Sequence, residues 1–161
     1  YVVGDRMANT SATPSDDELS ERIIELRIPS RLGYERVAMD AASSIARRMG
    51  FQSERIDALR TAIAEAVTNA IEHGNQQTED MKVLVMLTIR SDELIVRVTD
   101  QGQQILDQSK VEIPPRIEDR FNKLDKGGWG IWLMRELMDE VEFSIAPDGS
   151  NHVRMVIHLE K

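Results

Sequence analysis

Two polar side chains in the segment Glu65-Ala-Val-Thr-Asn69 could act together on a charged ligand. They are four residues apart, so on a helix they share one face, where a carboxylate and a carboxamide can meet a hard cation and a phosphate tail. Glu72 falls on the same face, opposite the apolar positions of the segment. Two interpretations are open: a site for a metal-bound phosphate, or the solvated face of an amphipathic helix. Asn69 favours the first, because Asn is a mediocre helix former in mid-helix.

An Asp and a Gly close a strand-like segment further along the chain. Asp100 follows a run of alternating apolar and polar residues, and Gly102 comes two residues later. Asp-x-Gly after a strand is common as an ordinary turn. This pair taken alone therefore does not identify a ligand.

A glycine-rich segment, Lys126-Gly127-Gly128-Trp129-Gly130, leads into a predicted helix. The free amides and the dipole at a helix N-terminus both favour an anion such as phosphate. Glycines also make ordinary turns, so this segment too has a second interpretation.

The elements that must position these residues can be predicted from periodicity and from helix and strand breakers. Ser30 is expected to cap the first helix, and Gly50 and Gly74 are expected to end the first and second helices. Strands are predicted at 21–28, 82–90, 93–99, 141–146 and 153–160, and helices at 31–49, 53–73 and 130–139. This order predicts an α/β (α+β) fold, a two-layer sandwich in which helices cover one face of a mixed, mainly antiparallel sheet.

The chain has 161 residues, the length of one domain. Residues 1–20 are polar, lack apolar periodicity and are expected to form a flexible tail, which leaves 21–161 as a single folded domain. The segment 103–127 is long and charged and contains Pro114-Pro115. Loops of this length in compact domains are often lids, so a lid is expected here.

Composition excludes several classes of protein. Cys is absent, which rules out thiol catalysis, disulfides and Cys-based zinc sites. The net charge of −8 argues against a general nucleic-acid binder, which needs a basic face to neutralise phosphates. No apolar run approaches 18 residues and no signal-peptide pattern is present, so a soluble, cytoplasmic protein is expected.

In this order, the three segments resemble the nucleotide-binding boxes of the GHKL (Bergerat) ATP-binding fold, which gyrase B, MutL and histidine kinases share. The resemblance implies ATP and Mg²⁺ as ligands. It assigns Asn69 as the Mg²⁺ ligand, Glu65 as the general base beside the γ-phosphate, and Asp100 as the acceptor of the adenine amino hydrogen. Guanine would face that acceptor with a carbonyl oxygen and be rejected. The glycines expected to make room for the nucleotide are Gly102, Gly128 and Gly130.

A closer resemblance, over about residues 21–160, is to the bacterial anti-sigma factor serine-protein kinases of the partner-switching type. The glycine box Gly-Gly-x-Gly-Ile-x-Leu-x-Arg is close to theirs. The usual Asp-x-Gly-x-Gly has Gln104 in place of its second Gly, which weakens a general histidine-kinase assignment and suits this branch better. Leu106 and Trp129 depart from the residues usual at their positions, Phe for the first and Leu or Met for the second.

The resemblance implies a protein that binds a sigma factor and phosphorylates a serine, or a threonine, on a STAS-domain antagonist. The resemblance also leads us to expect a homodimer, while the net charge and the lack of a long apolar run predict no direct contact with nucleic acid or membrane. Histidine kinases need an additional segment with an acceptor His, and gyrase-like and MutL-like ATPases need a transducer domain, neither of which this sequence contains. Two alternatives remain: a non-catalytic ATP-binding module, against which Glu65 and Asn69 argue, and a switch kinase that acts on a scaffold and phosphatase system without contacting sigma.

Overall fold

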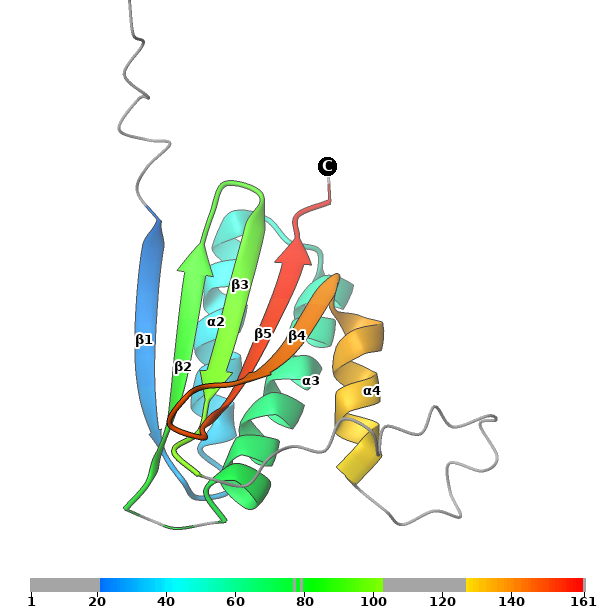
Figure 1. Cartoon of the computed structure of the whole chain (residues 1–161). Helices are drawn as coiled ribbons and strands as arrows, with labels where there is room; N and C mark the ends of the chain where they lie inside the picture. Colours follow the sequence, from blue (N-terminus) through cyan, green and yellow to red (C-terminus); the bar gives the residue numbers. More distant parts are fainter. Residues whose placement is uncertain (1–20, 77, 79, 103–126, 161) are drawn as a thin grey trace, which may run out of the picture.

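The structure is a computed structural model that describes residues 21–76, 78, 80–102 and 127–160. In this part of the chain, one five-stranded sheet has its helices on one face (Figure 1). The strands lie in the order β1-β2-β3-β5-β4, and every neighbouring pair is antiparallel. The predicted two-layer α/β architecture is therefore confirmed. The expected tail at 1–20 and the expected lid, apart from Gly127, lie outside the described residues.

The strands follow the predicted ones within one or two residues at each end. Ser91 and Asp92 form the expected tight turn between β2 and β3, in which the N–H of Arg90 donates to the carbonyl of Glu93 at 3.0 Å. Because β5 lies between β3 and β4, the start of β5 is a direct neighbour of the end of β3. The strand bounds are β1 Arg22–Pro29, β2 Lys82–Ile89, β3 Glu93–Thr99, β4 Glu140–Ile145 and β5 Asn151–His158.

The helices are α2 Glu35–Met49, α3 Ser53–Asn69, the π-helical turn η1 Ala70–Gly74, and α4 Gly127–Leu137. The prediction that Ser30 caps the first helix is wrong. The helix begins four residues later than expected, after a turn at residues 31–34, and Ser30 is buried where its hydroxyl accepts a hydrogen bond from Asn75. Gly50 ends α2 as predicted, in the left-handed conformation that glycine adopts without strain.

The core lies between the helices and the inner face of the sheet. The apolar positions that predicted the second helix are all buried: Ile56, Leu59, Ile63, Ala66, Val67 and Ala70. Alternate residues of β2 and β3 meet them, since successive strand side chains point to opposite faces. These inward residues are Val83, Val85, Leu87, Leu94, Val96 and Val98.

The end of α3 widens into the π turn η1. The N–H of Asn75 donates to the carbonyl of Ala70, five residues earlier, at 2.8 Å. Single π turns inside helices often occur at functional sites, because the extra residue redirects the chain. Here the turn brings Gly74 against the carboxylate of Asp100, just after β3.

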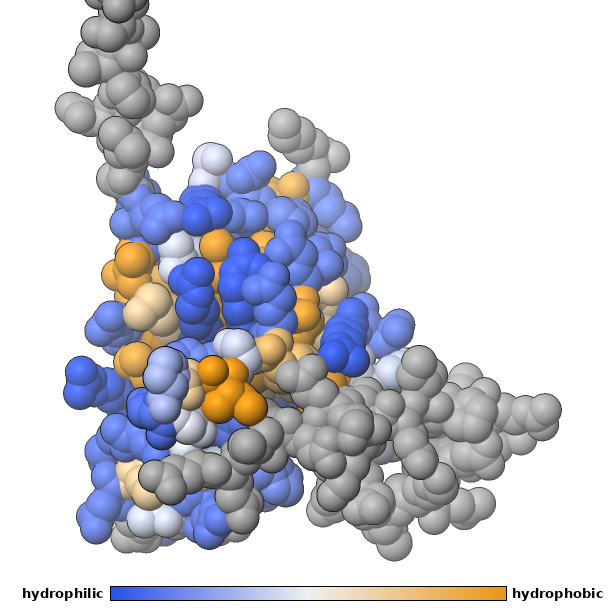
Figure 2. Space-filling model, viewed as in Figure 1, coloured by the Kyte–Doolittle hydropathy of each residue, from blue (hydrophilic) through white to orange (hydrophobic). Residues whose placement is uncertain are grey.

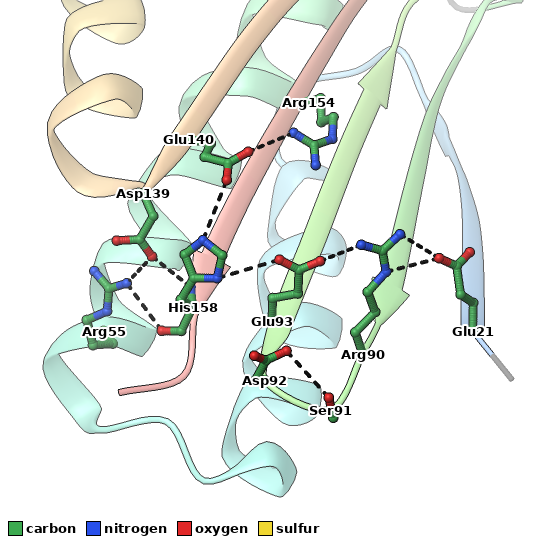
Figure 3. Close-up of polar contacts among 10 residues, drawn as sticks. All are labelled: Glu21, Arg55, Arg90, Ser91, Asp92, Glu93, Asp139, Glu140, Arg154 and His158. Carbon is green, nitrogen blue, oxygen red and sulfur yellow. Dashed lines mark hydrogen bonds and ion pairs between the residues drawn. The ribbon is translucent and has the colours of Figure 1, made fainter. Parts of the chain in front are cut away.

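The opposite face of the sheet carries mainly hydrophilic side chains (Figure 2). Glu93 accepts from Arg90 at 2.6 Å and lies 3.5 Å from His158, which lies 3.6 Å from Glu140 (Figure 3). Arg154 continues this row with a contact of 3.0 Å to Glu140. Exposed ion pairs contribute only about 0–1 kcal/mol each, so the row mainly keeps this face polar.

None of the described helices is both long enough and apolar enough to span a membrane.

Candidate functional site

Asp100 follows the last residue of β3 and is almost fully buried, with 3% of its surface exposed. Its Oδ1 accepts hydrogen bonds from the backbone N–H groups of Gly102 and Asn151, each at 3.1 Å. Its Oδ2 accepts one from Nδ2 of Asn151 at 3.0 Å. A carboxylate has about four lone-pair sites, so within the described part of the chain one site on Oδ2 is left for another donor. Gly74 packs against this oxygen.

Two glycines allow the chain to come this close to Asp100. A Cβ on Gly74 would collide with the carboxylate of Asp100, and a Cβ on Gly102 would collide with the carbonyl of Gly74. The space beside Gly102 is thus filled by the end of η1. The contact between these two segments requires both glycines, and the expected role of Gly102 toward a nucleotide stays a prediction.

Asn75 connects three segments of the chain near Asp100 through its side chain. It is 1% exposed. Its Nδ2 donates to Oγ of Ser30 at 2.6 Å and to the carbonyl of Lys82 at 3.0 Å. Its Oδ1 accepts from the N–H of Gln101 at 2.7 Å. The end of β1, the start of β2 and the residue after Asp100 are therefore fixed to one side chain. Buried amides with every bond satisfied rigidify their surroundings.

Glu65 and Asn69 lie at the other end of the site, under the first turns of α4. A Cβ on Gly130 would stand 2.6 Å from Oε2 of Glu65 and 3.2 Å from Nδ2 of Asn69. Asn69 is 9% exposed and Glu65 is half-buried, so this face of α3 is only partly open to solvent. Neither side chain has a hydrogen-bond partner within the described part of the chain.

The protonation of Glu65 is perturbed. Burial raises the pKa of its carboxyl above the ordinary value, and the negative charge of Glu72 raises it further. A raised pKa makes a carboxylate a better proton acceptor, and such shifts are frequent at functional sites.

These residues fit a Mg²⁺-bound phosphate chain. Mg²⁺ prefers oxygen ligands and uses one or two from the protein together with phosphates and water, and the carboxamide of Asn69 can supply one such oxygen. The described residues contain no cluster of three or more His, Asp or Glu side chains that would build an all-protein metal site. The N-terminus of α4, where Gly130 lies close to both side chains, presents free amides to an anion.

The structure brings the three sequence segments together. Gly130 lies at Glu65 and Asn69 of α3, and the turn that follows α3 places Gly74 against Asp100. Gly128 lies in the first turn of α4, which begins three residues earlier than predicted. Gln104, Leu106, Pro114-Pro115 and Lys126 lie outside the described residues.

Sequence reasoning missed Asn75 and Asn151, both of which are buried. A signal existed for Asn151: it follows the Asp-Gly-Ser turn and opens a strand, where an apolar residue would be usual. No local signal identified Asn75, because two of its side-chain partners, Ser30 and Gln101, are 45 and 26 residues away in the sequence. The rings of Trp129 and Trp132 in α4 meet edge to face with centroids 5.3 Å apart.

Comparisons with known proteins agree with this geometry. The family model of the histidine kinase-like ATPase domain matches residues 28–157. Serine-protein kinase RsbW of Oceanobacillus iheyensis is 34% identical over 123 residues, which cover 75% of this chain and 78% of that protein. Serine-protein kinase RsbW of Bacillus subtilis is 32% identical over 140 residues, which cover 86% of this chain and 84% of that protein.

Two solved structures share the fold. The structure of the RsbU and RsbW domains of Rv1364c from Mycobacterium tuberculosis has a TM-score of 0.62 at 16% identity, covering 87% of this chain and 33% of that one. The SiaB-SiaC complex from Pseudomonas aeruginosa has a TM-score of 0.61 at 13% identity, covering 83% of this chain and 88% of the matched one.

The chain belongs to the histidine kinase-like ATPase family, and within it to the RsbW-type serine-protein kinases. The fold class and the family predicted from the sequence are thereby confirmed.

Proposed function

We propose that this protein binds ATP and Mg²⁺, transfers the γ-phosphoryl group to a serine or threonine of a STAS-domain antagonist, and sequesters a sigma factor when the antagonist is phosphorylated. The observation that carries the proposal is the pair Glu65 and Asn69, which lie under Gly130 at the N-terminus of α4 and have no hydrogen-bond partner among the described residues. The family relationship supports the same reading, since the relatives are named serine-protein kinases.

Each site residue has one role in this mechanism. Asp100 holds the base through the acceptor site left on Oδ2, and the start of α4 meets the phosphates with its amides. Asn69 would hold Mg²⁺ through its carboxamide oxygen, and a bound Mg²⁺ would supply neutralisation of the phosphate charge. Glu65 accepts the proton of the attacking hydroxyl, and its raised pKa suits this task. Phosphoryl transfer depends mainly on positioning and charge neutralisation, which these groups supply.

The partners follow from the family and from the charge. A protein of net charge −8 is suited to protein partners with basic or mixed surfaces rather than to nucleic acid. Sequestration of sigma, action in the bacterial cytoplasm and a homodimeric state are parts of the proposal. Gly102, Gly128 and Gly130 complete the proposed nucleotide site.

The test is phosphoryl transfer to a STAS-domain protein of the same organism, followed by mass spectrometry of its serines and threonines. Titration calorimetry with ATP, with and without Mg²⁺, accompanies it on the wild type, Asp100→Asn and Glu65→Gln. We expect Glu65→Gln to bind ATP but to transfer at least about 100-fold more slowly, and Asp100→Asn to lose ATP binding with or without Mg²⁺.

Three outcomes would change the proposal. Equal transfer by wild type and Glu65→Gln would remove Glu65 from the role of base. ATP binding without transfer to the STAS protein, together with capture of sigma, would leave a non-catalytic sequestering module. Transfer without any affinity for sigma would favour a switch kinase of another system.

A further inference from the structure

Strand β1 lies at one edge of the sheet, with β2 on one side and no described strand on the other (Figure 1). All but one of the exposed large apolar side chains in the described part of the chain lie in β1 or just after it. They are Ile23, Ile24, Leu32, Tyr34 and Val37, and Ile145 of β4 is the exception. An exposed edge strand that carries apolar side chains is a template for pairing with another chain.

The ladder with β2 shows which backbone groups of β1 face the free edge. The N–H of Ser30 donates to the carbonyl of Met81 at 3.3 Å, and this pair continues the β1–β2 register. Hydrogen-bonded and non-hydrogen-bonded pairs alternate along an antiparallel ladder. The even-numbered residues of β1 therefore turn their N–H and C=O groups toward β2. The same groups of Ile23, Glu25 and Arg27 point outward, to the free edge.

Two side chains of β1 carry opposite charges that no described residue neutralises. Glu25 and Arg27 are exposed and have no ion pair or hydrogen bond in the described part of the chain. Both lie on the face of the sheet opposite to the core residue Ile28, since successive strand side chains alternate between faces. Their neighbours across the ladder are the uncharged Met86 and Leu84. Each charge is therefore available to an opposite charge on an added strand.

A second copy of β1 can pair with this edge in a register that suits both the backbone and the charges. A two-fold axis at Leu26 places Glu25 of each copy opposite Arg27 of the other. The outward N–H and C=O groups of these two residues then face one another, as an antiparallel ladder requires. Opposite charges directly across a ladder stabilise it, and like charges destabilise it. An axis at Glu25 or at Arg27 would instead set a charge against its own copy.

Other pairings of two copies fit less well. An axis at Ile24 would set Arg27 against Glu21, which already accepts hydrogen bonds from Arg90. The opposite edge of the sheet, β4, carries Glu140 and Glu142 but no basic side chain, so two copies of β4 would meet with charges of one sign. The self-complementary edge is therefore that of β1.

We propose that two copies of this chain form a dimer through the free edge of β1, with the two strands antiparallel about an axis at Leu26. The two five-stranded sheets then continue into one. On the helix side of the sheet, Ile24 of one copy lies opposite Ile28 of the other, so apolar surface exposed in one copy is covered. The inference rests on the homodimeric state included in the proposed function, and it adds the surface, the register and the charged pairs.

The test measures the dimer dissociation constant by sedimentation equilibrium over a series of protein concentrations. Arg27→Glu sets a carboxylate against Glu25 in both pairs and should raise the dissociation constant about tenfold or more. The double variant Glu25→Arg/Arg27→Glu exchanges the two charges, restores both opposite pairs and should return the constant close to the wild-type value. The matched control is Arg97→Glu, the same reversal at an exposed position of β3 away from the edge, and it should leave the constant unchanged.

Hydrogen exchange shows whether the two strands pair through their backbones. The N–H of Glu25 should exchange slowly in the wild-type dimer and quickly in Arg27→Glu, at concentrations where that variant is monomeric. The N–H of Leu26 points toward β2 and should stay protected in both proteins, which shows that the strand remains folded in the variant.

Several outcomes would overturn the inference. A monomeric wild type would do so, as would an Arg27→Glu protein as dimeric as the wild type or a double variant no tighter than Arg27→Glu. Fast exchange at Glu25 in a wild-type dimer would show that the copies meet through another surface. Titration of the same wild-type sample with ATP and Mg²⁺ tests the proposed function separately: a dimer that binds no ATP would overturn the ATP site and leave the interface standing.

Discussion

The two ends of the site differ in how completely their polar groups are satisfied. At Asp100, three donors already hold the carboxylate, and the glycines at 74 and 102 close the backbone around it. At Glu65 and Asn69, two polar side chains have no partner in the described part of the chain, and the pKa of Glu65 is raised. Selection of a base requires a fixed acceptor, whereas charge neutralisation requires groups that stay free until the ligand binds.

The two ends of the candidate site also differ in the parts of the chain that form them. The base end is built from strand ends and backbone contacts, so a change there should damage both the fold and binding. The proposed phosphate end is built from side chains on α3 beneath the start of α4, so a change there should spare the fold and damage function. The following variants test this contrast.

The largest effect is expected at the base end for Gly102→Ala. The new Cβ would collide with the carbonyl of Gly74, and backbone cannot move aside as a side-chain tip can. We expect the free energy of unfolding to fall by about 3 kcal/mol or more and ATP binding to be lost. Urea unfolding and calorimetry measure the two effects.

The control for this variant is Gly33→Ala. Gly33 has a positive φ of 103° but nothing within 4 Å of an added Cβ. Only the backbone strain of about 1–2 kcal/mol applies there, and ATP affinity should be unchanged. A Gly102→Ala protein as stable as Gly33→Ala would contradict the close contact between the two segments.

At the phosphate end, Asn69→Ala should remove the dependence of ATP affinity on Mg²⁺. The wild type should bind ATP more tightly with Mg²⁺, by about ten- to 100-fold for a lost metal ligand, and the variant should bind equally with and without it. Since Asn69 has no hydrogen-bond partner among the described residues, stability should change by less than about 1 kcal/mol. A large loss of stability would show that Asn69 is a structural residue.

Gly130→Ala tests whether the phosphate end tolerates a change that the base end does not. Its Cβ would meet Oε2 of Glu65 at 2.6 Å, and that carboxylate can rotate away. We expect the Tm to change by a few degrees at most and phosphoryl transfer to slow about tenfold or more, because the base is displaced. Transfer at the wild-type rate would show that Glu65 does not need its place beside α4.

The same contrast explains what the sequence could predict. Amphipathic periodicity predicted α3, its buried face and the strand alternation, because these depend on local spacing. The three motifs predicted which segments form the candidate site. The structure brings together those motif residues that lie in the described part of the chain. Side chains that connect distant segments, Asn75 and Asn151, carried too little local signal. Ser30 was misassigned for the same reason: a serine before a helix suggests a cap, but its partner Asn75 is 45 residues away.

The smallest expected effect is that of Glu72→Gln, which tests how much the charge of Glu72 contributes to the raised pKa of Glu65. Burial raises the pKa of Glu65 first, and the charge of Glu72 adds to it. Removing that charge lowers the pKa of Glu65 toward its ordinary value. The base must be ionised, so the rate falls as the pH falls through this pKa. The acidic limb of the pH profile of kcat/KM should therefore move to lower pH, and kcat/KM at pH 8 should change little. Glu25→Gln removes an equal charge from the edge strand β1 and should leave the limb in place. An unmoved limb in Glu72→Gln would mean that burial alone sets the pKa of Glu65, or that another group is the base.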